Sequence, residues 1–574
     1  MSPLINEKHP IGCLLLVLFA VIVLRSLWLR LNEELKIRRH GGHSLKMWPW
    51  DPFGKPDTNT NDFDRNSIPL WLTVTGLFFT YSITAHAQRD ENIKFMWNSL
   101  RALANDRNEN PQTYEVRMVG QRYIMTADQE NVKAMLAVQF GDFGKGPRFR
   151  RDWGDLMGRS IFVSDGRRWH DARQRLRPMF ARQRIGDLQC FERHVQALLP
   201  LVDGEKTVDV KNLFSRFAMD AAADFSMGIE LDSLHNKNSD YFDAQERVRH
   251  TQSLIERAGP LNWLIPRSRF KADLDIIDKF MEPTLMKALE EAGPEKTPST
   301  RAEDKHSLGD GGAEPRKKYT FVQECLEVSR DPQVLRDEIR TILIAGRDTT
   351  ATTLAWCFYE LACHPEVVRD LRREIQAGVG LEKEPTYEDL KNIKMLSHVL
   401  NETLRIYPVA PFNVRAALKD TSLPRGGGPD GNGPVGVPAG TTVVYSTHLL
   451  HLNPDAYSDC GPDFPPLHEF HPRRWQHWTP KPWSYIPFHG GPRICLGQQF
   501  ALMEMSYVLV RVFQRYSRLE VSKGLGSPPA YDTRGWLRRA QRPDVAELYV
   551  NSKLRMASEI TLAPRHPVHV TFFR

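Results

Sequence analysis

The sequence predicts one large globular domain, which follows an N-terminal membrane anchor. Three observations support this fold class. Charged residues make up 26% and hydrophobic residues 41% of the 574 residues, as in a folded globular body and unlike a disordered or polytopic chain. No internal repeat or long disordered linker divides the chain. Finally, residues 11–24 form an unbroken apolar run.

That run belongs to an apolar span of about 19 residues, which is just long enough to cross a bilayer if Arg25 reaches toward the interface. Of the lysines and arginines, only Lys8 precedes the span. The basic residues after it are Arg25, Arg30, Lys36, Arg38 and Arg39. The positive-inside rule therefore places the rest of the chain in the cytosol. Because no small-x-small cleavage site follows, a single-pass anchor over residues 1–40 is favoured over a cleaved signal peptide.

The seven cysteines are sparse and odd in number, so they do not indicate a disulfide framework. Their pattern favours a reducing compartment. The net charge of +7 is modest, although arginines cluster at residues 148–151 and 167–184. No recognised nucleic-acid motif accompanies these clusters, so a nucleic-acid partner is not expected.

The most informative segment places Cys495 in a glycine-rich loop just before a predicted helix. Backbone N–H groups and the positive end of a helix stabilise a thiolate, the form of cysteine that binds metal. Gly491 and Gly497 allow close backbone approach, and Arg493 supplies a cation. With Phe488 included, the spacing F-x-x-G-x-R-x-C-x-G arises by chance in about 1 in 10,000 chains of this size. The spacing thus favours a metal ligand over a buried structural cysteine.

This loop resembles the haem-binding loop of the cytochrome P-450 monooxygenases. The resemblance implies a mainly α (α+β) fold, a helical prism around haem with small β-sheets, over residues 86–574. It implies haem b with Cys495 as the axial thiolate, and haem-binding roles for Phe488, Gly491, Arg493 and Gly497. It further implies that dioxygen is a substrate and that NADPH supplies electrons through a separate reductase.

A second motif, A-G-R-D-T at residues 345–349, lies inside an apolar-rich run over residues 331–363 and matches the family pattern A-G-x-D-T. An acid beside an alcohol can relay protons into an otherwise dry pocket. By resemblance, Asp348 and Thr349 are the catalytic pair. Gly346 is expected to let the helix open where dioxygen must fit. A helix N-cap is the alternative, and the position inside a long helix disfavours it.

A third motif pairs Glu402 with Arg405, which share a helix face because they are three residues apart. In the family such a pair is buried and joined by a second arginine, here Arg474 in the F-H-P-R-R-W segment at residues 470–475. The family's usual glutamate before that arginine is Arg473. We expect this departure to weaken or re-aim the structural triad.

A fourth motif places Trp169 and Arg173 on one face of a helix. By resemblance to the W-x-x-x-R element, both contact the haem propionates. The arginines of residues 167–184 share this helix. They form either a solvated basic face or a docking surface for an acidic flavoprotein, NADPH cytochrome P-450 reductase, with cytochrome b5 as a further candidate partner.

Four stretches, residues 133–150, 164–184, 330–350 and 404–415, resemble the fungal and yeast enzymes that hydroxylate n-alkanes and fatty acids. The resemblance implies terminal or near-terminal hydroxylation of a long aliphatic chain at the endoplasmic reticulum membrane. The expected lining of the substrate pocket consists of Ala345, Val409, Ala410 and Phe412. Alternatives are oxidation of another apolar xenobiotic or secondary metabolite, a haem-thiolate isomerase or dehydratase, and an inactive haem-binding protein.

Residues 41–85 form a linker or insert, of which residues 54–85 do not fit the family pattern. They are a second membrane segment, a genuine loop near the substrate entrance, or translated intron, and the sequence leaves all three open. Residues 296–318 and 424–438, rich in glycine, proline and charge, are expected to be surface loops.

Overall fold

The computed structural model describes most of the chain after residue 111. The described residues are 112–119, 121–180, 188–236, 240–292, 320–326, 329–428, 431–461, 463–522 and 556–574, with 20–21, 24–25, 28, 31–38, 83, 93 and 95–96 nearer the N-terminus. Most of the predicted anchor, nearly all of residues 54–85 and the predicted loop at 296–318 lie outside them. Within the described part of the chain, no helix combines the length and apolar content that a membrane span requires.

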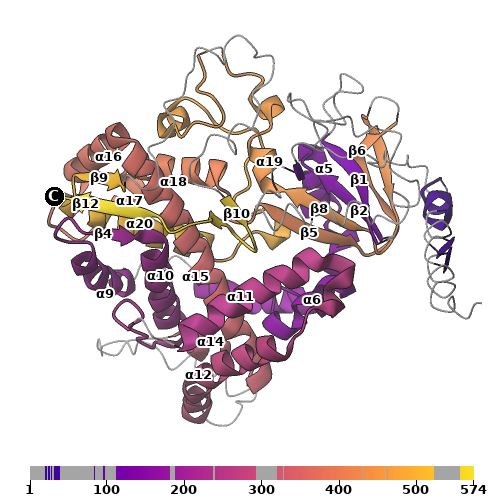
Figure 1. Ribbon diagram of the computed structural model, residues 1–574, viewed down its shortest axis with the longest axis horizontal. Coiled ribbons are helices and arrows are strands. Elements are labelled where there is room, and N and C mark those ends of the chain that lie inside the picture. Colours follow the sequence, from indigo (N-terminus) through magenta and orange to yellow (C-terminus); the bar gives the residue numbers. More distant parts are fainter. Residues whose placement is uncertain are drawn as a thin grey trace, which may run out of the picture.

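Helices dominate the described residues, as the sequence predicted (Figure 1). The α-helices are α5 (Gln129–Lys133), α6 (Gly146–Met157), α7 (Gly166–Leu176), α9 (Gln189–Leu198), α10 (Val210–Met227), α11 (Asp240–Ala258), α12 (Ser268–Ala292), α14 (Phe321–Leu326), α15 (Pro332–Cys363), α16 (Pro365–Gly378), α17 (Tyr387–Asn392), α18 (Lys394–Ile406), α19 (Thr447–His451) and α20 (Gln498–Arg515).

The long helix α15 runs through the middle of the molecule (Figure 1). Asp331 caps its N-terminus by accepting a hydrogen bond from the backbone N–H of Gln333, and Pro332 takes the first helical position, where its missing N–H costs nothing. The helix ends before Pro365, which starts α16. Much of α15 is buried, which gives the molecule a rigid axis on which other helices pack.

The main core lies between α15 and its neighbours. Helix α10 packs along α15, where the ring of Phe214 lies 4.7 Å from that of Phe358. Two residues before Phe358 on α15, Trp356 stacks on Tyr407 with a centroid separation of 4.0 Å. The indole of Trp356 also donates to the backbone carbonyl of Leu562 at 2.7 Å, so its polar edge is satisfied inside the core.

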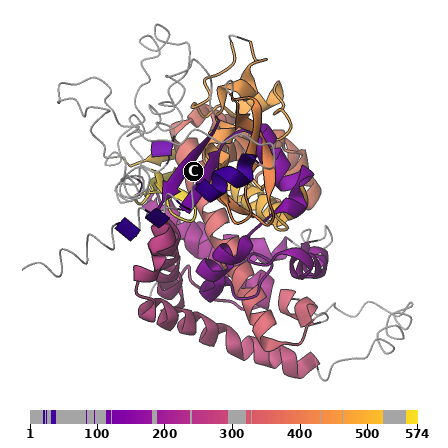
Figure 2. The same ribbon diagram turned by 90° about the vertical axis from the view of Figure 1, so that its right-hand side faces the viewer.

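Small sheets complete the fold. One has the order β1 (Thr113–Met118), β2 (Gln121–Thr126), β8 (Thr442–Ser446), β5 (Phe412–Ala417) and β3 (Phe143–Gly144), antiparallel except for the β2–β8 pair. A second has the order β4 (Thr207–Asp209), β12 (His569–Phe573) and β9 (Arg518–Val521). A short pair joins β10 (Met556–Ser558) to β11 (Leu562–Pro564). Figure 2 shows the orange β5–β8 region above the magenta helices.

The prediction of a surface loop at residues 424–438 is wrong. The chain there forms a hairpin of β6 (Thr421–Gly427) and β7 (Gly433–Val437). Leu423, Val435 and Val437 are buried in a cluster with the main β-sheet, so alternate side chains hold an otherwise glycine-rich hairpin in place.

Residues 31–38, at the end of the segment predicted as anchor and basic stop, are helical and pack on the sheets. Ile37 is buried, and a Cβ on Gly436 of β7 would lie 2.8 Å from it. Arg117 of β1 donates to Glu33 at 2.8 Å. This helix therefore rests directly on the folded domain.

Candidate active site

The loop before α20 positions Cys495. A short 3₁₀ turn over Gly491–Arg493 starts with Gly491 at φ +67°, and a Cβ there would lie 1.8 Å from the carbonyl oxygen of Leu136. Only glycine fits this approach. The N–H of Cys495 donates to the carbonyl of Phe488 at 3.0 Å, which closes the loop, and α20 begins three residues after the thiol.

Cys495 is accessible to a solvent-sized molecule. Nevertheless, the protein packed around its thiol raises the thiol's pKa. Both hold if the sulfur faces an enclosed space and not bulk solvent. The N–H groups of Gly497 and Gln498 and the charge of Arg173 lower the pKa, without offsetting the burial. A bound metal cation would supply the missing stabilisation of the thiolate.

Helix α7 brings Trp169 and Arg173 to this loop, and their contact with the haem propionates stays a prediction. Arg173 donates to the carbonyl of Ile494 at 3.0 Å. The Arg493 guanidinium lies 4.6 Å from the ring centroid of Trp169 and donates at 2.8 Å to Asp165. The sequence assigned the thiolate-stabilising cation to Arg493, whereas Arg173 is the cation that lowers the pKa of Cys495.

Two further cationic residues near this loop were missed from the sequence. Burial and the neighbouring Arg415 and Arg493 hold the pKa of Lys145 well below its usual range. Burial and Arg415 likewise lower the pKa of Arg493 to about 10. Lys145 precedes α6 and Arg415 lies on β5, and both fall in stretches that carried the family resemblance. Lys145, Arg415 and Arg493 thus form a cluster of positive charge near the loop. Asp165 is one of the few carboxylates that oppose it.

The predicted catalytic pair lies on α15. Ala345 is exposed in the middle of this otherwise buried helix, so this face of α15 borders an accessible space. Thr349 donates its hydroxyl to the Ala345 carbonyl at 2.8 Å. The helix runs without a break through Gly346, so the expected opening is not present in this structure.

Asp348 sits in a network of buried charge. Burial raises its pKa, while Arg347 and Arg249 lower it. The Nε of Arg347 lies 3.6 Å from the Asp348 carboxylate. Arg347 is itself buried and contacts Glu246 of α11. An aspartate with a raised pKa beside a hydroxyl can both hold and release a proton.

The predicted structural triad is fully formed. Glu402 accepts from Arg405 Nε at 2.8 Å and Nη2 at 2.9 Å, and from Arg474 Nε at 2.8 Å. The indole of Trp475 and the N–H of His471 add bonds of 2.9 Å each. All three charged side chains have no exposed surface.

The expectation that Arg473 weakens or re-aims the triad is wrong. Its side chain is 52% exposed and donates to Asp370 of α16 at 2.9 Å. The extra charge therefore points away from Glu402 and finds its own partner at the surface.

An apolar cavity of about 480 Å³ lies between the main sheet, α6, the end of α11 and the turn before β11. Of the predicted pocket residues, Phe412 lines it. Ala345, Val409 and Ala410 are not among its lining residues, and the carbonyl of Val409 is used in a bond from Leu562 N at 2.9 Å. Apolar lining residues that the sequence did not indicate are Met96, Val116, Met118, Met125, Phe149, Trp153, Ile265, Val414, Val444 and Ile560.

The family model "Cytochrome P450" matches residues 93–545. The chain is 40% identical to "Cytochrome P450 monooxygenase pvhE" of Talaromyces variabilis, with 88% of each chain covered. It is 39% identical to "Cytochrome P450 52A9" of Candida maltosa, with 73% of this chain and 80% of that one covered. The fold is similar to that of the cytochrome P450DA heme domain, with a TM-score of 0.63 over 84% of this chain at 20% identity.

The residues at the loop fit a haem with an axial cysteine thiolate. Cys495 is accessible although the surrounding protein raises the pKa of its thiol, and Gly491 removes a side chain where the backbones meet. The buried Nε of Arg493 has no hydrogen-bond partner within the described structure, and further cations surround it. A ligand that carries carboxylates would satisfy this excess of buried donors.

Proposed function

This chain belongs to the cytochrome P450 family and is a monooxygenase, and from this premise we propose that it hydroxylates long aliphatic chains, fatty acids or n-alkanes, at or near the terminal carbon. The observation that carries the proposal is the apolar cavity of about 480 Å³. Its size is that of a small-molecule site, and flexible methionines and rings make up much of its wall. The resemblance of four sequence stretches to fungal and yeast alkane and fatty-acid hydroxylases points the same way.

Cys495 would hold the haem iron as its thiolate ligand, and Arg493, Arg173 and Trp169 would face the propionates. When bound, the haem supplies dioxygen activation and oxidation of a C–H bond. Asp348 and Thr349 then hold and pass protons on the α15 side, where Ala345 leaves room beside the helix. Because an aliphatic chain offers no chemical handle near its end, the shape of the cavity selects the carbon.

The electrons would come from NADPH through NADPH cytochrome P-450 reductase, with cytochrome b5 as a second donor. The supporting feature is the basic face of α7. Arg167 has 94% of its side chain exposed, and Arg168 beside it is exposed. Such a face attracts an acidic partner over long range. We place the enzyme at the endoplasmic reticulum membrane, anchored by residues 1–40, with the catalytic domain in the cytosol.

The test combines full-length, haem-loaded protein with reductase, NADPH and a series of saturated fatty acids and n-alkanes, with an aromatic hydrocarbon for comparison. We expect hydroxylation of the aliphatic chains at or next to the terminal carbon. Turnover of the aromatic compound alone would favour another apolar substrate class. Peroxide rearrangement without NADPH would indicate an isomerase, and retained thiolate ligation without any turnover would indicate an inactive haem protein.

A further inference from the structure

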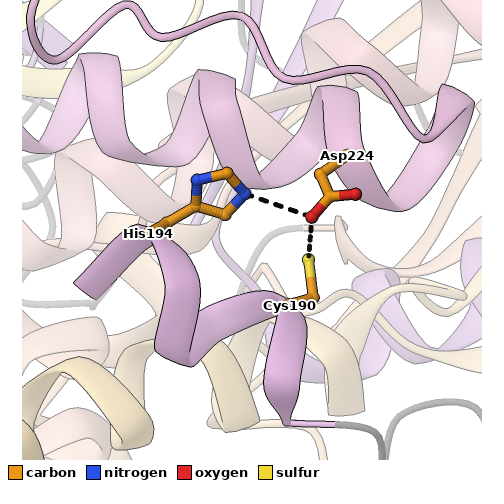
Figure 3. Close-up of side chains that lie close together, drawn as sticks. All are labelled: Cys190, His194 and Asp224. Carbon is orange, nitrogen blue, oxygen red and sulfur yellow. Dashed lines mark hydrogen bonds and ion pairs between the residues drawn. The ribbon is translucent and has the colours of Figure 1, made fainter. Parts of the chain in front are cut away.

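A second cluster of metal-ligating side chains lies between α9 and α10. Cys190 and His194 come from α9, and Asp224 comes from α10 (Figure 3). None of the three belongs to the Cys495 loop or lines the apolar cavity. The activity described above gives this cluster no role.

The local structure explains why the three groups converge. Cys190 and His194 are four residues apart on α9, so they project from the same face of the helix. Helix α10 packs against that region of α9 and presents Asp224 one turn before its C-terminus. Figure 3 shows the thiol and the imidazole both directed at the carboxylate.

Two of the three distances between ligand atoms match those of a tetrahedral metal shell. Cys190 Sγ and His194 Nε2 each lie 3.3 Å from the same oxygen of Asp224, and the three ligand atoms lie within 4.8 Å of one another. In tetrahedral zinc sites the bonds are about 2.0–2.3 Å long, which separates neighbouring ligand atoms by roughly 3.3–3.7 Å. Small side-chain movements would therefore suffice to admit an ion.

Charge and burial favour a cation at this point. The Asp224 side chain has no exposed surface, and that of His194 is only 10% exposed. Arg193, which is 41% exposed, now contacts Asp224. Arg193 also lies 3.3 Å from Glu230, so it keeps a carboxylate partner if a metal ion displaces it from Asp224.

We infer that Cys190, His194 and Asp224 form a zinc-binding site, with water in the fourth position. A thiolate and an imidazole select a borderline-soft ion over Mg²⁺ or Ca²⁺, which prefer oxygen ligands. On binding, the Cys190 thiol gives its proton to the buffer, and Arg193 moves to Glu230. The ion would join α9 to α10, the helix that packs along α15.

The experiment titrates Zn²⁺ into the haem-loaded, full-length protein by calorimetry and records X-ray absorption at the zinc edge. We expect one ion per chain with a sulfur scatterer at about 2.3 Å. Cys190→Ala should remove the sulfur scatterer and lower the affinity at least about tenfold. Arg193→Gln should raise the affinity, because a competing cation is removed.

Cys460→Ala is the matched control, since Cys460 is another partly buried thiol beside an aspartate, Asp459. It should leave the zinc affinity and the sulfur scatterer unchanged. Circular dichroism without metal checks that each variant is folded. A zinc shell without sulfur, or equal affinity for wild type and Cys190→Ala, would overturn the site.

Discussion

Glu402 carries the densest set of hydrogen bonds among the predicted residues. Two arginines, an indole and a backbone N–H converge on one carboxylate without exposed surface. The arginines favour the charged form, and the pKa of Glu402 is lowered although burial opposes the shift. A buried group of this kind tolerates the loss of a partner poorly, because the remaining charges stay desolvated.

Glu402→Gln should therefore lower the free energy of unfolding by about 3–5 kcal/mol, because Arg405 and Arg474 lose their counter-charge. Urea unfolding of the haem-loaded protein measures the effect. Arg473→Ala is the control, since its exposed pair with Asp370 contributes only about 0–1 kcal/mol. Equal losses in the two variants would contradict the assignment of the triad to Arg474.

Thr349→Ala should lower product formation by about 100-fold and divert reducing equivalents to hydrogen peroxide, because a positioned proton donor is removed. The ratio of product to NADPH consumed measures the coupling. Thr353→Ala is the control. The Thr353 hydroxyl lies one turn after Thr349 and donates in the same way, to the Thr349 carbonyl at 2.9 Å. If Thr353→Ala uncouples as strongly, the effect belongs to helix geometry and not to the relay.

Sequence reasoning grouped the candidate site residues whose spacing is local. Cys495 and its loop, the pair on α7 and the triad each form a short pattern, and the structure gathers the expected residues at each. Lys145 and Arg415 have no such pattern, because they reach the loop from separate elements through tertiary packing. The direction of Arg473 also depended on a partner, Asp370, that is distant in sequence.

At the scale of elements, α19 holds two buried histidines beside the triad. Burial and, to a smaller extent, the charge of Arg405 lower the pKa of His448 to about 4. Burial, His448 and Arg405 together lower the pKa of His451 to about 3. Their ordinary pKa is about 6.5. At a pH between the folded-state pKa values and 6.5, the unfolded state binds more protons than the folded state. The free energy of unfolding therefore rises with pH in this range.

The stability contributed by neutral His448 is thus fully present above pH 6.5 and is lost as the pH falls through about 4. We expect the urea midpoint of the wild type to decrease from pH 7 to pH 5. In His448→Asn this decrease should be smaller, because one of the two histidines no longer titrates. A variant with the same pH slope as the wild type would show that His448 does not contribute.

Helix α7 has one side that meets the Cys495 loop and a basic outer side, and the second can be tested separately. Arg167→Glu with Arg168→Glu should raise the reductase concentration for half-maximal turnover by roughly tenfold at low salt and weaken its salt dependence. The CO-bound spectrum should not change. Arg518→Glu with Arg574→Glu, at two exposed arginines beside the β12–β9 pair, is the charge-matched control. If both variants behave alike, net charge and not the α7 face governs the encounter.

The hairpin β6–β7 shows where element prediction failed. Glycines and prolines at residues 424–438 are typical of loops, and only Leu423, Val435 and Val437 indicate a buried face. Pairing between β6 and β7 makes these residues form strands, although their local sequence does not favour strand structure. Helix α15 was predicted better because its apolar-rich run at residues 331–363 is continuous in the sequence.

At the scale of the whole molecule, the candidate site residues come from one long helix, one small sheet and one loop. Helix α15 brings Asp348 and Thr349 from the core, while β5 carries Phe412 at the cavity and Arg415 near the cationic cluster. The loop of Cys495 closes the site through its contact with Leu136. Segments from residue 83 to residue 560 line the apolar cavity, which explains why no single motif reveals the substrate.

The most direct test of this account is the spectrum of the reduced, carbon monoxide-bound protein after reconstitution with haem. The wild type should show the red-shifted Soret band of thiolate-ligated haem. Cys495→Ser should lose that band, while Cys357→Ser, at a buried thiol of α15, should keep it. A wild type without the shifted band, or a Cys495→Ser variant that retains it, would contradict the assignment of Cys495 as the iron ligand.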